Sequence, residues 1–142
     1  MVSSGMRDAG YRYVVDDCWF DSQRDAAGNL RANRFTFPSG MKALGDYIHS
    51  RGLKFGIHQV PGERTCALAT GAYPGSTGSR GMKPRTPRHS PRGRRLLKYD
   101  GCSPTGARDE QVGRFTLMRD ALRATGRPIV CSIIPQQPAR QA

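Results

Sequence analysis

Short hydrophobic runs alternate with longer amphipathic segments along this chain. Residues 11–15, 54–57, 96–99 and 128–133 are mainly apolar and contain aromatic and β-branched side chains. Runs of this length and composition are typical of β-strands. The pattern therefore predicts four strands.

Two segments between these runs have helical spacing. The first opens with Pro38-Ser39-Gly40 and ends at Gly52, and the second covers residues 109–125. Because strands and helices alternate, we expect a parallel α/β sheet whose strands are neighbours in chain order. Apolar residues three or four positions apart predict the packing faces of the two helices: Met41, Leu44, Tyr47 and Ile48, then Val112, Phe115, Met118 and Leu122.

Acidic residues stand where two of the predicted strands end. Asp16 and Asp17 follow the first run, and Asp100 follows the third. Lys98 lies two residues before Asp100, so an extended strand places both side chains on one face. Acids at the carboxyl ends of parallel strands are the catalytic arrangement of (β/α) barrels, which need roughly 200 residues or more. With 142 residues, the chain is too short to form a complete barrel of this kind.

Residues 82–95 break the alternation. A crossover helix is expected between two parallel strands, but this segment contains three prolines, which exclude a continuous helix.

The same segment also carries six Lys and Arg residues and no acid, in a chain with a net charge of +12. Taken alone, this charge favours an anionic partner, so a nucleic-acid-binding protein is one alternative function. Against it, the segment has no interleaved aromatic residues.

Four motifs in order resemble glycoside hydrolase family 27, whose typical member is a retaining α-galactosidase. They are YRYVVDDCWFDSQRDAAGNL (11–30), FTFPSGMKALGDYIHSRGLKFGI (35–57), LLKYDGC (96–102) and FTLMRDALRATGRPIV (115–130). The resemblance implies that residues 1–142 are a fragment of the catalytic (β/α)8 barrel, about half of it. It also implies hydrolysis of terminal α-galactosides with retention.

The resemblance assigns roles to individual residues. It implies that Asp100 is the nucleophile and that Asp16 and Asp17 bind galactose hydroxyls. Lys98 and His58 would also contact the sugar, although His58 stands where the family usually has tyrosine. A retaining enzyme needs a second carboxyl group, which the family places after Ala142. We therefore expect this chain by itself to be inactive, and a non-catalytic carbohydrate-binding remnant is a further alternative.

The resemblance also implies a disulfide between Cys66 and Cys102. The four cysteines have no Cys-x-x-Cys spacing, so a zinc site is not expected, and no metal or cofactor is predicted.

No apolar run is long enough to span a membrane. Residues 1–8 are polar and unlike a signal peptide, but the resemblance implies an extracellular full-length parent.

The irregular segment 82–95 has a second interpretation, namely a reading-frame error. Codons compatible with these residues, read in the neighbouring frame, spell a sequence beginning His-Glu-Ala-Gln-Asp-Ala-Ala, which resembles the family's helix. Residues 136–142 show a similar slip, because relatives continue differently after Pro135. We therefore expect both segments to be out of frame, and the excess of basic charge to be largely an artefact.

Overall fold

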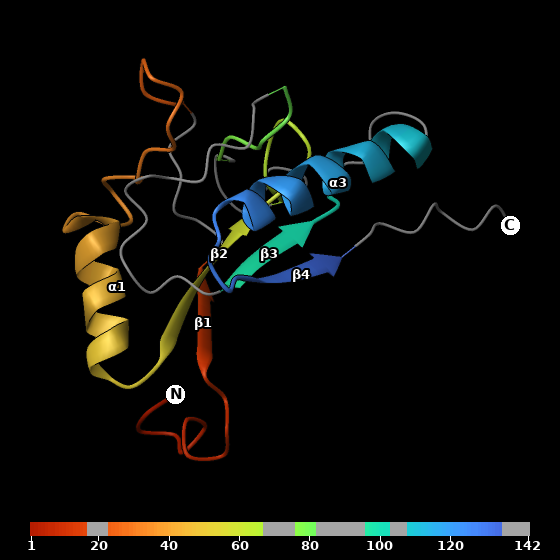
Figure 1. The fold of residues 1–142 in the computed structure, drawn as a ribbon. Coiled ribbons are helices and arrows are strands. Elements are labelled where there is room, and N and C mark those ends of the chain that lie inside the picture. The colour runs from red at the N-terminus through yellow and green to blue at the C-terminus, as the bar shows by residue number, and fades with distance from the viewer. Residues whose placement is uncertain (17–22, 67–75, 82–95, 103–107, 135–142) are drawn as a thin grey trace, which may run out of the picture.

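The computed structural model describes residues 1–16, 23–66, 76–81, 96–102 and 108–134. Four strands form one parallel sheet, and they are neighbours in chain order (Figure 1). This confirms the predicted topology, with strand ends shifted by one or two residues. The strands are β1 (Tyr13–Asp16), β2 (Lys54–Gln59), β3 (Leu96–Asp100) and β4 (Val130–Ile134).

The register places equivalent side chains of β2 and β3 on the same face. Gly56 pairs with Leu96, and His58 pairs with Lys98. A Cβ atom on Gly56 would lie 3.0 Å from Cδ2 of Leu96 and 3.1 Å from its backbone oxygen. A glycine therefore allows these two strands to approach closely at the start of β3.

Helix α1 (Gly40–Ser50) covers the other face of β2. Met41 and Ile48 pack with Leu53 and Phe55 into the hydrophobic core. Gly52 ends the helix with φ of 72°, a conformation that glycine adopts without steric cost. Its N–H donates to the His49 carbonyl, and that of Leu53 donates to Ile48, which is the Schellman pattern of helix ends.

The predicted packing face of α1 is partly wrong. Met41 and Ile48 are buried as expected, but Tyr47 is 59% exposed. The guanidinium group of Arg51 lies over the Tyr47 ring, 5.1 Å from its centroid. The aromatic ring is thus covered by a cation on the helix surface rather than by the core.

Helix α3 (Arg108–Ala124) joins β3 to β4 and runs alongside β3 in Figure 1. Its Phe115 ring meets Tyr99 edge to face, with centroids 5.3 Å apart. None of the described residues of α3 is fully buried. The predicted inward position Val112 is 56% exposed, so this part of the expected face is wrong. A neighbouring element that would cover it is not among the described residues.

Several expectations fall outside the described residues. They include Asp17, the segment 82–95 and the tail 136–142. No described helix combines the length and the apolar character that a membrane span requires.

Candidate active site

Three predicted site residues meet where β2 and β3 end. Asp100 is the last residue of β3, and Lys98 precedes it by two positions on the same face. The Lys98 Nζ atom lies 3.5 Å from Oδ2 of Asp100, which forms an ion pair. His58, the register partner of Lys98, has its Nε2 atom 3.8 Å from the same oxygen. The carboxylate therefore lies between a cation and an imidazole.

His58 is neutral at neutral pH. Its side chain is 1% exposed, and burial lowers its pKa from 6.5 to about 4. The charge of Lys98 lowers the pKa as well, while the Asp100 carboxylate opposes the shift. The contact between His58 and Asp100 is longer than a hydrogen bond. Lys98 is consequently the cation that neutralises Asp100 at this point of the sheet.

A disulfide joins the loop after β2 to the residues after β3. Cys66 and Cys102 are bonded, and their Cα atoms are 5.2 Å apart, within the usual range for a bridge. The structure thus contains the disulfide that the family resemblance implies. The Cys66 Sγ atom also lies 3.9 Å from Nε2 of His58, so the bridge borders the carboxylate.

Two linked hydrogen bonds hold the same loop against β3. The Tyr99 hydroxyl and the Ser79 hydroxyl are 2.7 Å apart, and Ser79 Oγ donates to the Val60 carbonyl at 2.7 Å. Because Ser79 uses its proton for Val60, Tyr99 is the donor in the first contact. Burial raises the pKa of Tyr99, which keeps this phenol protonated. These hydrogen bonds hold the loop against the face of β3 that is opposite to Asp100.

The structure places Asp16 at the end of β1, the strand next to β2. Asp16 ends β1 at the same edge of the sheet, but its register partner is Ile57 rather than His58. Val14 and Ile57 both pack against the α1 core, and strand alternation puts Asp16 on their face. Asp17, the next residue, lies outside the described residues. A sugar contact from this acidic pair therefore remains an expectation.

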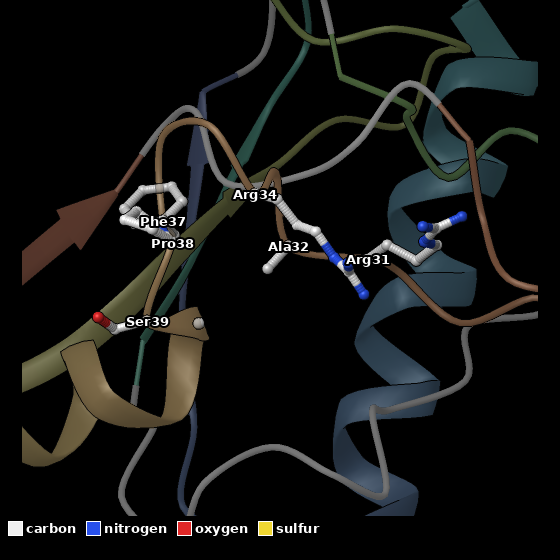
Figure 2. Close-up of a pocket in the computed structure, with 7 residues that line it drawn as sticks. Arg31, Ala32, Arg34, Phe37, Pro38 and Ser39 are labelled. Carbon is white, nitrogen blue, oxygen red and sulfur yellow. The ribbon is translucent and has the colours of Figure 1, made fainter.

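A separate pocket opens beside the start of α1. It has a volume of about 490 Å³ and is shown in Figure 2. Ser39 stands where the helix begins, and the guanidinium groups of Arg31 and Arg34 come from the preceding loop. None of its lining residues belongs to the predicted site. The sequence offered only scattered loop residues here, so the pocket was not predicted.

Sequence reasoning also missed the place of Cys66 beside His58. That proximity depends on the path of residues 60–66, which no local pattern specifies. The available signal was an unusual histidine at the end of β2, eight residues before a cysteine. It was too weak to predict a contact.

A parallel sheet with a charged cluster at its carboxyl edge is the arrangement found in part of a (β/α) barrel. A family model described as alpha galactosidase A matches residues 1–139. The chain belongs to this family, glycoside hydrolase family 27, as the motifs had suggested.

Individual relatives agree with this assignment. Alpha-galactosidase 2 of Arabidopsis thaliana is 43% identical over 134 residues, which are 94% of this chain and 32% of the relative. Alpha-N-acetylgalactosaminidase of Gallus gallus is 43% identical over 93% of this chain and 31% of the relative. The chain therefore spans about a third of the curated relatives it matches.

A solved relative shows the same fold. The alpha-galactosidase of Saccharomyces cerevisiae, determined with raffinose, is 33% identical and has a TM-score of 0.73. The match covers 92% of this chain and 28% of that structure. These relatives are glycosidases, and the comparisons do not support the nucleic-acid-binding alternative.

Proposed function

We propose that this chain is the nucleophile-bearing part of a retaining α-galactosidase. The observation that supports it best is the placement of Asp100, in a family member, at the carboxyl end of β3 beside Lys98 and His58. In this proposal Asp100 attacks the anomeric carbon and forms a glycosyl ester. Lys98 neutralises the carboxylate in the free enzyme and binds a sugar hydroxyl in the complex.

The proposed reaction needs a second carboxyl group about 5–5.5 Å from the nucleophile. It protonates the leaving oxygen and then activates the water that cleaves the ester. Since the chain spans only 32% of the Arabidopsis relative, we propose that this group belongs to the part of the barrel not represented here. The chain by itself would then be inactive.

We propose a terminal α-galactoside as the substrate. The relatives include α-galactosidases, and the yeast enzyme was determined with raffinose, which carries such a group. The proposed sugar contacts of Asp16 and Asp17 would fix the orientation of the galactose hydroxyls. The chicken relative indicates the competing possibility, an N-acetylated galactoside.

A chimaeric enzyme tests the proposal. Residues 1–81 and 96–134 of this chain would replace the matching part of Arabidopsis alpha-galactosidase 2, with that enzyme's own segment kept in place of 82–95. We expect the chimaera to hydrolyse an aryl α-galactoside, and Asp100→Asn to reduce turnover to background because an amide is not a nucleophile. Asp109→Asn, an exposed acid in the first turn of α3, is the matched control and should retain activity.

The outcome separates the alternatives. A folded chimaera that prefers an aryl N-acetyl-α-galactosaminide would contradict the proposed substrate. Full activity in Asp100→Asn would contradict the nucleophile. Galactose binding without any turnover would support the carbohydrate-binding alternative instead.

The same chimaera tests the proposed frame error. We propose that 82–95 and 136–142 are out of frame, on the basis of the prolines and unopposed bases in 82–95. A second chimaera that carries 82–95 as printed should be insoluble or inactive, because these prolines do not permit a crossover helix. Equal activity of both chimaeras would reject the frame error.

A further inference from the structure

We propose that breaking the Cys66–Cys102 disulfide creates a binding site for a zinc-class divalent metal ion, formed by His58, Cys66 and Asp100. The ligand atoms of these three side chains lie within 4.8 Å of one another, and no other group of three potential ligands as close is found among the described residues. The site goes beyond the proposed glycosidase activity. It requires only a change in the covalent state of Cys66.

The geometry is close to that of a metal site with three protein ligands. In tetrahedral zinc sites the bond lengths of about 2.0–2.3 Å place neighbouring ligand atoms roughly 3.3–3.6 Å apart. Here His58 Nε2 is 3.8 Å from Asp100 Oδ2 and 3.9 Å from Cys66 Sγ. The third pair, Cys66 Sγ and a carboxylate oxygen of Asp100, lies within 4.8 Å. Side-chain adjustments of up to roughly 1 Å would therefore bring the three ligands to these separations. One nitrogen, one sulfur and one oxygen ligand are the set that zinc accepts.

The disulfide controls the site because a bonded sulfur is a poor ligand. A dithiol or phosphine reductant donates two electrons, the S–S bond breaks, and both cysteine sulfurs take up protons. When the metal binds, the Cys66 thiol releases its proton to solvent and the thiolate becomes the ligand. With the bridge intact, Lys98 balances the charge of Asp100. The thiolate adds a negative charge that favours a dication.

The position of Cys66 does not depend on the bridge alone. The preceding residue, Thr65, is buried, and its N–H donates to the Ser76 carbonyl at 3.0 Å. Its hydroxyl lies 3.2 Å from the Ser76 hydroxyl, and Arg64 pairs with Thr77 in an antiparallel bridge. These contacts hold the loop beside His58 after the disulfide is cut. The ligands therefore stay near each other in the reduced state.

Access and burial also suit a bound ion. His58 is buried, whereas the Asp100 side chain is 17% exposed and the Lys98 side chain 34% exposed. An ion can thus reach the oxygen and sulfur ligands from solvent and then contact the buried imidazole. A metal on Oδ2 would also block attack by Asp100, and this consequence alone rests on the proposed function.

Cobalt(II) binding tests the proposal by spectroscopy, independently of any activity. In a Cys18→Ser, Cys131→Ser background, Cys102→Ser leaves Cys66 as a permanent thiol without added reductant. Titration of the chain with Co²⁺ should give a thiolate-to-cobalt charge-transfer band that saturates at one equivalent and disappears on addition of Zn²⁺. The same background with the disulfide intact should give no band.

Matched variants identify the ligands. In the Cys102→Ser background, His58→Gln should weaken Co²⁺ binding on the order of 100-fold, since one direct ligand is lost. His49→Gln, the same change on α1, should leave the affinity unchanged. Adding Cys66→Ser should abolish the band. Absence of the band in Cys102→Ser, or equal affinities of the two histidine variants, would overturn the site. Because the readout is metal binding, failure of the glycosidase proposal would not produce either result.

Discussion

The two strand–helix–strand units of this chain have the same connectivity but very different packing. In β1–α1–β2 the buried residues Met41, Ile48, Leu53 and Phe55 form a continuous core. In β3–α3–β4 no residue of α3 is fully buried, and four of the five residues of β4 are exposed. The first unit encloses hydrophobic surface by itself, whereas the second presents its surface outward. A parallel sheet requires both faces to be covered, so the second unit depends on more of the barrel.

The largest expected effect is on the core of the first unit. Phe55 is 0% exposed, and Phe55→Ala should lower the free energy of unfolding by about 3–5 kcal/mol. This is a large fraction of the stability of a small domain, so the midpoint of urea unfolding should fall steeply. Phe35, which is 99% exposed, provides the control. A Phe35→Ala effect as large as that of Phe55→Ala would contradict the described core.

The next effect concerns the bridge between the two units. The Cys66–Cys102 disulfide closes a loop with a sequence separation of 36. Its removal by paired serine substitutions should cost about 3–4 kcal/mol through the entropy of the unfolded chain. The midpoint of urea unfolding measures this change. An unchanged midpoint would show that the two units are coupled without the bridge.

The third effect is a dependence of stability on pH. The unfolded pKa of His58 is near 6.5 and the folded pKa is about 4. Below pH 6.5 the unfolded chain takes up a proton that the folded chain does not, so stability falls as the pH drops from 6.5 towards 4. The shift in the pKa of His58 corresponds to a loss of about 3 kcal/mol in the free energy of unfolding over this pH range.

Unfolding of His58→Gln over the same pH range isolates this contribution. The variant should lose most of the slope of stability against pH between 4 and 6.5. His49→Gln should keep the slope of the parent. A slope that survives in His58→Gln would assign the dependence to other groups.

The smallest effect is expected on the second unit. Leu117 of α3 is 61% exposed, so Leu117→Ala should change the unfolding free energy by less than about 0.5 kcal/mol. Met41→Ala on α1 is the matched comparison and should cost about 2–5 kcal/mol. Urea unfolding of both variants sharpens the contrast. Similar losses would mean that α3 is packed as tightly as α1.

Local patterns were sufficient to predict the sheet. The strands and their parallel order follow from short apolar runs that alternate with helical spacing, and both signals act over neighbouring residues. The helix faces were harder, because Tyr47 and Val112 have the right spacing but lie at the edges of the covered surface. Spacing reports which residues share a face, and only packing decides how wide the buried face is.

The site was predictable only in part. Asp100 and Lys98 are two positions apart on one strand, so their proximity follows from the strand period. The contact of His58 with Asp100 depends on the register between β2 and β3, and that of Cys66 on a long loop. These are non-local features that one sequence does not encode in a readable pattern. The roles of Asp16 and Asp17 rest on the family resemblance.

Covalent trapping of the nucleophile tests the central claim most directly. A fluorinated α-galactosyl fluoride reacts without a proton from the acid, and its ring fluorine slows release of the glycosyl ester. Peptide mapping by mass spectrometry of the labelled chimaera should place the sugar on Asp100, and Asp100→Asn should remain unlabelled. A label on any other carboxylate of a folded, active chimaera would contradict the assignment of Asp100 as the nucleophile.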